Sequence, residues 1–152
     1  MTQRMDYNAA TPAGMKALGG VYGHIMGCGL PKVLVDLVYL RVSQINGCAY
    51  CIDMHSRDLL KEGVNVEKLV LVPAWREAAS LFDTTERAAL AWAETVTQVA
   101  ETGVPDADYA AAAAVFSQQQ LADLTIAIGL MNAYNRMAIS FRAQPAAVTA
   151  AR

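Results

Sequence analysis

The sequence contains no cluster of basic residues and no long apolar run. Its 12 Lys and Arg residues are outnumbered by 14 Asp and Glu residues, so the formal net charge is −2. Binding to nucleic acid or to an anionic membrane surface depends on a concentrated positive surface, which this composition does not provide. A transmembrane helix needs about 20 consecutive apolar residues, and no such run occurs. We therefore expect neither a nucleic-acid nor a membrane partner.

Cysteine is also scarce, with three residues in the chain, and the N-terminal residues lack the apolar core of a signal peptide. These features favour a cytoplasmic location, where thiols are kept reduced. An odd number of cysteines in that compartment argues against a structural disulfide framework. It favours redox or metal chemistry instead.

Strand patterns are missing as well. No segment alternates polar and apolar residues, so the predicted class is all-α. The 152 residues are expected to form one domain with a single core and about seven helices. In order, the expected elements are an arm over 1–10, helices over 11–26, 31–45, 48–61 and 65–71, a turn over 75–81, helices over 83–101, 105–116 and 117–142, and a tail over 145–152.

Apolar residues, many of them alanine, make up 55% of the chain. A small soluble domain of this composition tends to cover part of its apolar surface with copies of itself. Alanine-lined helices can approach one another closely, which suits such an interface. We therefore expect a homo-oligomer, with a tightly packed monomer as the alternative.

One stretch concentrates the reactive residues. Asn46-Gly47 is typical of a helix end, because both residues tolerate the left-handed conformation, and a second helix is expected to begin at or just before Cys48. On that helix Cys48 and Cys51 are three residues apart and His55 follows four residues later, so their side chains lie over successive turns. The positive end of the helix dipole favours the thiolate form of a cysteine at the helix start. The stretch is therefore a candidate redox-active dithiol beside a proton carrier.

Taken alone, this spacing is compatible with four kinds of site. A structural zinc site needs four ligands, and only His24 and Cys28 are left to complete one. A thioredoxin-like site follows a strand, and no strand is predicted here. The other two are a redox dithiol on an all-α scaffold and a pair of buried structural cysteines beside an ordinary histidine.

The residues from 36 to 51, followed by His55, are similar to the core of the alkylhydroperoxidase D (AhpD)-like proteins, which belong to the carboxymuconolactone decarboxylase superfamily. The segments Pro-Ala-Trp-Arg-Glu at 73–77 and Glu-Arg-Ala-Ala-Leu-Ala-Trp at 86–92 also resemble that family. The resemblance covers residues 30–95 and implies an all-helical fold that commonly assembles as trimers or hexamers. It also implies a thiol-dependent peroxidase, since the decarboxylase members lack the dithiol.

Carried onto this chain, the resemblance assigns the roles of the thiol site. Cys51 would be the peroxidatic thiol that attacks the peroxide and becomes a sulfenic acid, and Cys48 would resolve it as a disulfide. His55 would relay a proton one helical turn from Cys51. An external dithiol, either a partner protein or a lipoyl group, would then reduce the oxidised pair. The resemblance implies no metal and no other cofactor.

Asp36 occupies the position at which the family usually carries the glutamate base of the proton relay, twelve residues before the first cysteine. Aspartate is shorter by one methylene, roughly 1.5 Å of reach. On an otherwise apolar helix its pKa is expected to be raised, which suits a base. The alternative is that Asp36 simply pairs with a cation from another helix.

Two other functions stay open from the sequence. The chain could be a lactone decarboxylase of the carboxymuconolactone type, in which case turnover would persist without either cysteine. It could also be a non-enzymatic redox sensor whose disulfide changes its assembly. A sensor would consume peroxide slowly and change its oligomer size on oxidation.

Overall fold

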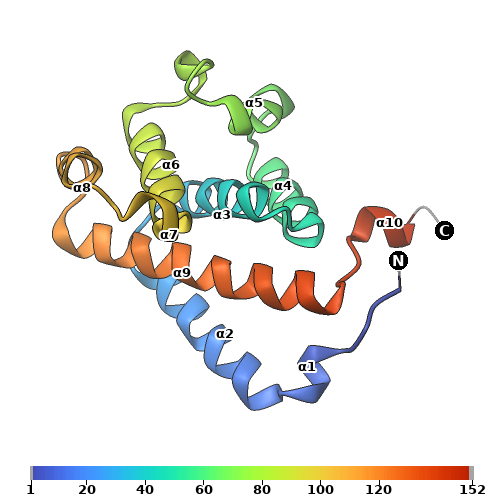
Figure 1. Ribbon diagram of the computed structural model, residues 1–152. Coiled ribbons are helices and arrows are strands. Elements are labelled where there is room, and N and C mark those ends of the chain that lie inside the picture. The colour runs from blue at the N-terminus through green and yellow to red at the C-terminus, as the bar shows by residue number, and fades with distance from the viewer. Residues whose placement is uncertain (1, 151–152) are drawn as a thin grey trace.

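The computed structural model describes residues 2–150, and throughout that range the regular structure is helical, without a strand. Figure 1 shows the helices gathered around α3, which packs against α4, α6 and α9. The predicted all-α class is confirmed. The elements are α1 (Tyr7–Ala10), α2 (Pro12–Gly27), α3 (Lys32–Asn46), α4 (Ala49–Lys61), α5 (Val66–Leu71), 3-10 segments at Val72–Ala74 and Ala79–Leu81, α6 (Thr84–Thr97), α7 (Val99–Thr102), α8 (Asp106–Ala113), α9 (Gln118–Phe141) and α10 (Ala146–Ala150).

The seven predicted helices correspond to α2, α3, α4, α5, α6 together with α7, α8 and α9, and the short helices α1 and α10 are additional. α1 interrupts the predicted arm, where the Asp6 side chain caps it, and α10 interrupts the predicted tail. The prediction of an irregular arm and tail is therefore wrong over α1 and α10. Residues 1 and 151–152 lie outside the described range. α7 is the end of the helix predicted over 83–101, set apart by a break at Gln98. Segments of four or five residues are too short to display a helical period.

α3 is buried on most of its faces because it is apolar around most of its circumference. Val35, Val38 and Val42 face a core cluster shared with α6 and α9. Leu37 and Leu40 face a second cluster, shared with α4, α5 and α6. Because the core lies on both sides of α3, the C-terminal end of this helix is held firmly.

The helix boundaries follow local signals in the sequence. Gly47 ends α3 in the left-handed conformation, with φ 69° and ψ 30°, as the Asn-Gly pair predicts. Two capping boxes, each with a reciprocal pair of side-chain to backbone hydrogen bonds, open α6 (Asp83 with Glu86) and α9 (Ser117 with Gln120).

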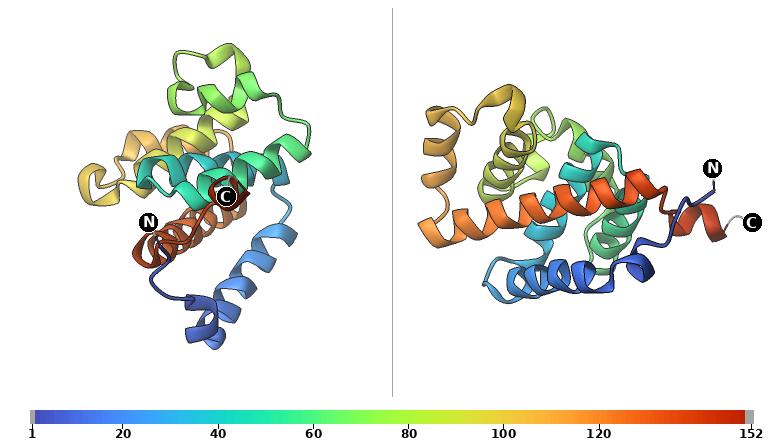
Figure 2. Two further views of the ribbon diagram at one scale, coloured as in Figure 1. Left: turned by 90° about the vertical axis from the view of Figure 1, so that its right-hand side faces the viewer. Right: turned by 60° about the horizontal axis from the view of Figure 1, so that its bottom comes forward.

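α2 lies against α9, on the side away from α5 and α6 (Figures 1 and 2). An ion pair joins the two helices, with Nε2 of His24 2.8 Å from Oδ1 of Asp123. Val21 and Tyr22 on α2 remain 36% and 40% exposed. Within residues 2–150, no helix combines the length and the apolar character that crossing a membrane requires.

Candidate active site

The turn between α3 and α4 positions the dithiol. After Gly47, the backbone N–H of Cys48 donates to the carbonyl of Ser43 (2.9 Å), which closes the end of α3. Cys48 is then the N-cap of α4, and its sulfur accepts a hydrogen bond from the backbone N–H of Cys51 at 3.4 Å. The sequence therefore places one thiol at the cap and the other in the first turn of the same helix.

The two sulfur atoms lie 2.7 Å apart and are almost completely buried, with Cys48 1% and Cys51 2% exposed. Their hydrogen bond makes them one titrating pair. That hydrogen bond lowers the pKa of Cys48 to about 7, against the effect of burial and with help from the backbone N–H groups of Cys51 and Tyr50. The same hydrogen bond, together with burial, raises the pKa of Cys51. The hydrogen bond therefore favours ionisation at Cys48 over Cys51.

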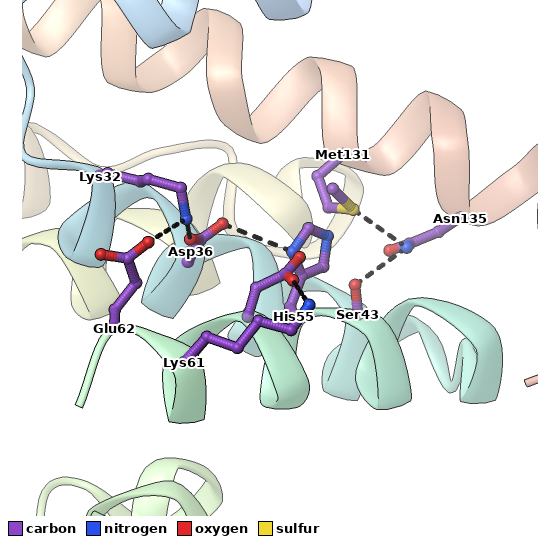
Figure 3. Close-up of polar contacts among 9 residues, drawn as sticks. Lys32, Asp36, Ser43, His55, Lys61, Glu62, Met131 and Asn135 are labelled. Atoms are coloured by element: carbon purple, nitrogen blue, oxygen red, sulfur yellow. Dashed lines mark hydrogen bonds and ion pairs between the residues drawn. The ribbon is translucent and has the colours of Figure 1, made fainter. Parts of the chain in front are cut away.

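A buried amide on α9 forms part of the surroundings of the dithiol. Asn135 is fully buried, and its Nδ2 donates to Oγ of Ser43 at 3.0 Å and to Sδ of Met131 at 3.4 Å (Figure 3). Its Oδ1 accepts from Nδ2 of Asn46 at 2.9 Å, so the orientation of the amide is fixed. Asn135 acts to lower the pKa of both thiols.

His55 lies one turn beyond Cys51 on α4 and is 4% exposed. Its Nδ1 is 3.6 Å from Oδ1 of Asp36 on α3, which is ion-pair distance but longer than a hydrogen bond (Figure 3). The ring of Tyr39 packs at a tilt against the imidazole of His55, and the two ring centroids lie 5.1 Å apart. Among the described residues, neither imidazole nitrogen has a hydrogen-bond partner. Both nitrogens are therefore available for a proton-transfer partner.

The surroundings of Asp36 differ from the expectation in two ways. Burial acts to raise the pKa of Asp36, but the neighbouring His55 and Lys32 outweigh it, so this pKa is lowered rather than raised. The cation is Lys32, one turn earlier on the same helix, whose Nζ lies 2.7 Å from Oδ2 of Asp36. Lys32 also reaches Glu62 at the C-terminal end of α4, at 3.2 Å. The prediction missed this pairing because the partner is local, at i−4, and does not come from another helix.

A cavity of about 410 Å³ opens onto Cys51 and His55. We call it the His55 cavity. Its wall consists mostly of tyrosine and methionine side chains from α1, α2, α4 and α9, with Asp58 as the only acidic group. The tyrosines and methionines are Tyr7, Met15, Tyr22, Tyr50, Met54, Met131 and Tyr134.

The remaining cysteine and histidine have other partners. The Cys28 thiol donates to the carbonyl of Ile25 at 3.1 Å, and His24 pairs with Asp123. Across residues 2–150, no three His, Cys, Asp or Glu side chains come together in a way that could hold a metal ion. The four-ligand zinc set considered from the sequence is thus not assembled in this part of the chain.

Residues 12–95 match the model of the carboxymuconolactone decarboxylase family. The chain belongs to this family. YdfG, an uncharacterised family relative from Bacillus subtilis (strain 168), is 33% identical over 140 residues, which make up 92% of this chain and 95% of YdfG.

Solved structures narrow the family resemblance. A protein of unknown function from Agrobacterium tumefaciens, proposed to be an antioxidant defence protein AhpD, superposes with a TM-score of 0.91 at 37% identity, covering 95% of this chain and 98% of its own. A peroxidase-related protein from Ralstonia eutropha JMP134, described as an AhpD core, shares the fold, with a TM-score of 0.79 at 23% identity over 91% of this chain and 73% of its own. The predicted AhpD-like character and fold are confirmed.

The family match ends before α9, and this is where the sequence analysis missed a contributor to the site. Asn135 lies outside both the matched range and the segment that resembles AhpD-like proteins. The sequence does contain one signal for this residue, because Asn135 is a polar side chain among the apolar residues of the buried face of α9. By itself, that signal does not say that the amide faces the cysteines.

Proposed function

We propose that the chain is a thiol-dependent peroxidase that reduces hydroperoxides through Cys51, Cys48 and His55, with Asp36 supporting the proton relay. The observation that carries the proposal is the His55 cavity. It gives a substrate access to Cys51 and His55 together, while the second thiol lies 2.7 Å from the first. Membership of an AhpD-like family adds independent support.

In the proposed reaction, the pair holds one proton, and its transfer from Cys51 to Cys48 leaves a thiolate on the sulfur that faces the substrate. That thiolate attacks one peroxide oxygen, so an S–O bond forms, the O–O bond breaks and an alkoxide leaves. His55 donates the proton that converts the alkoxide to an alcohol. Cys48, once deprotonated, then attacks the sulfenic sulfur, and a disulfide forms with the loss of water.

The proposed partners follow from this cycle. The disulfide returns to the dithiol only with two electrons from outside, so we propose a dithiol reductant, either a protein or a lipoyl group, and no metal or other cofactor. We also propose that the chain self-associates as a trimer or hexamer. Large exposed apolar residues on α5, such as Val66 at 55% and Val70 at 65%, support this. Light scattering on the protein as it elutes from a size-exclusion column would measure the mass of the assembly directly. The mass of a monomer would contradict the proposal.

The deciding experiment measures hydroperoxide consumption with dithiothreitol as the electron donor. Cys51→Ser and Cys48→Ser should both abolish steady-state turnover, and His55→Gln should slow it by about 10²-fold. Cys28→Ser is the matched control, because it removes a thiol that bonds to Ile25 instead of to the pair, and it should retain full activity. Full activity in Cys51→Ser would rule the mechanism out.

The same variants separate the proposal from its rivals. A lactone decarboxylase would keep its turnover of a cyclic lactone when both cysteines are replaced. A redox sensor would consume peroxide slowly in the wild type and change its mass on oxidation. The thiol peroxidase requires catalytic turnover that depends on both sulfurs.

A further inference from the structure

The two sulfurs of the dithiol line different cavities. The His55 cavity is lined by Cys51, whereas a second cavity of about 320 Å³ is lined by Cys48. Among residues 2–150, only Tyr50 and Ala138 border both cavities. These two side chains therefore lie between the cavities, and Tyr50 is one of the two residues that separate the cysteines in the sequence.

The second cavity, which we call the C-terminal cavity, is bounded by the end of α9 and the chain that follows it. Arg142 takes the left-handed conformation, with φ 57°, and turns the chain back over the start of α4. The backbone N–H of Ala147 donates to Oδ2 of Asp53 on α4 at 3.2 Å, which fixes α10 beside this opening. Val148 of α10 lines the cavity.

The direction of approach decides which sulfur of a disulfide is attacked. In thiol–disulfide exchange the attacking thiolate, the attacked sulfur and the leaving sulfur lie nearly in a line. A thiolate in the C-terminal cavity meets Cys48 first, with Cys51 behind it as the leaving group. A thiolate in the His55 cavity meets Cys51 first.

We propose that the dithiol reductant of this peroxidase enters the C-terminal cavity and attacks Cys48, while the hydroperoxide uses the His55 cavity. The inference rests on the proposed function and identifies where its second substrate binds. Cys48 is 1% exposed, so a reductant thiol has to enter the cavity to reach it. Among the described residues that line the cavity, Arg142 is the one that carries a charge, which suits a neutral or anionic reductant.

The electrons and protons of this exchange balance. The reductant thiolate forms a bond to Cys48, the bond from Cys48 to Cys51 breaks, and the electron pair stays on Cys51, which takes a proton from His55 in the adjoining cavity. The second thiol of the reductant then loses its proton and attacks the mixed disulfide, so that the reductant leaves oxidised. Cys48 departs as a thiolate, which the N-terminal N–H groups of α4 stabilise. Each cycle oxidises one dithiol and reduces one disulfide.

The test uses a disulfide made with diamide, so that it does not depend on peroxide. Brief treatment of this oxidised chain with 2-mercaptoethanol, followed by acid quenching and peptide mass analysis, should locate the mixed disulfide on Cys48. An adduct on Cys51 would overturn the proposal. If peroxide fails to oxidise the wild-type chain, the proposed function fails, yet the site of the adduct still decides between the two cavities.

Two variants that narrow one cavity each give a second measurement. Ile139 lines the C-terminal cavity alone, and Met15 lines the His55 cavity alone. Ile139→Trp should slow reduction of the diamide-made disulfide by dithiothreitol at least tenfold. The rate at which cumene hydroperoxide oxidises the reduced dithiol should stay within twofold of the wild type. Met15→Trp should do the reverse. Slower reduction in Met15→Trp with normal reduction in Ile139→Trp would mean that both substrates use the His55 cavity.

Discussion

Nδ1 of His55 and Oδ1 of Asp36 face each other at 3.6 Å, from two helices that meet at the dithiol. The other oxygen of the same carboxylate, Oδ2, accepts a hydrogen bond of 2.7 Å from Nζ of Lys32, whose side chain is half-exposed. Asp36 therefore links a half-exposed cation to a buried imidazole. A side chain longer by one methylene could close the gap to His55 without breaking the contact to Lys32.

The first prediction concerns this gap. Asp36→Glu should raise the rate of peroxide-dependent oxidation of the dithiol a few-fold, because the carboxylate then reaches hydrogen-bond distance of His55. Asp36→Asn should lower that rate by roughly tenfold, since it removes the carboxylate charge that faces His55 in the proposed relay. Stopped-flow tryptophan fluorescence or rapid alkylation would follow the oxidation. Asp58→Asn is the control, because this residue lines the same cavity but bonds to Lys61, and its rate should stay within twofold of the wild type.

Asn135 provides a prediction on thiol acidity. Asn135→Leu removes an amide that lowers the pKa of Cys48, so the pKa of this thiol should rise above its value of about 7. The pH dependence of iodoacetamide alkylation measures this directly. Thr125→Val is the control on the same helix, where the hydroxyl donates to the carbonyl of Leu121 and accepts from Nε1 of Trp92. An equal shift in both variants would mean that general loosening of α9, not the amide of Asn135, sets the pKa.

The ion pairs of Asp36 also predict how stability depends on pH. Because the pKa of Asp36 in the folded chain lies below its ordinary value of 3.8, its pairing stabilises the fold above that value. The stabilisation is lost as the pH falls through the folded pKa. Wild type should therefore be more stable than Asp36→Asn at about pH 6, and the difference should shrink by about pH 3. Urea denaturation at the two pH values gives the comparison, and a constant difference would contradict the assigned pKa.

Gly47 allows a test of the turn that presents the thiols. Its φ of 69° strains any residue with a Cβ, so Gly47→Ala should lower the free energy of unfolding by about 1 kcal/mol. Gly23→Ala, in the exposed middle of α2 with open space around its Cβ, should raise it by about 0.5–1 kcal/mol. Thermal unfolding of both variants measures the contrast. If both changed stability in the same direction, the left-handed conformation would not be the cause at Gly47.

The sequence predicts the parts of the fold that depend on neighbours along the chain. The Asn46-Gly47 helix end, the capping boxes at Asp83 and Ser117, and the seven longer helices all follow from residues within one or two turns of one another. The short helices escape prediction because four or five residues carry no period. The pairing of Asp36 with Lys32 also has i,i+4 spacing in the sequence, but the apolar residues around Asp36 favour a buried carboxyl with a raised pKa instead.

In the site, too, the features set by neighbouring residues can be predicted from the sequence, and those set by tertiary packing cannot. The spacing of Cys48, Cys51 and His55 predicts their common helix, and the structure brings Asp36 to the imidazole. The ionisation of the pair could not be predicted, because it depends on which cysteine is the N-cap and on an amide from α9. Tertiary packing brings Asn135 to Ser43 from 92 residues away in the sequence.

The position of Asn135 has a consequence for exchanging parts between relatives. The residues that perform the proposed chemistry lie on α3 and α4, whereas the amide that tunes their acidity belongs to α9. A graft of residues 30–95 into another family member would transfer the thiols and leave this amide behind. The redox potential of such a chimaera should follow the recipient's last long helix, so the motif and its potential can be varied separately.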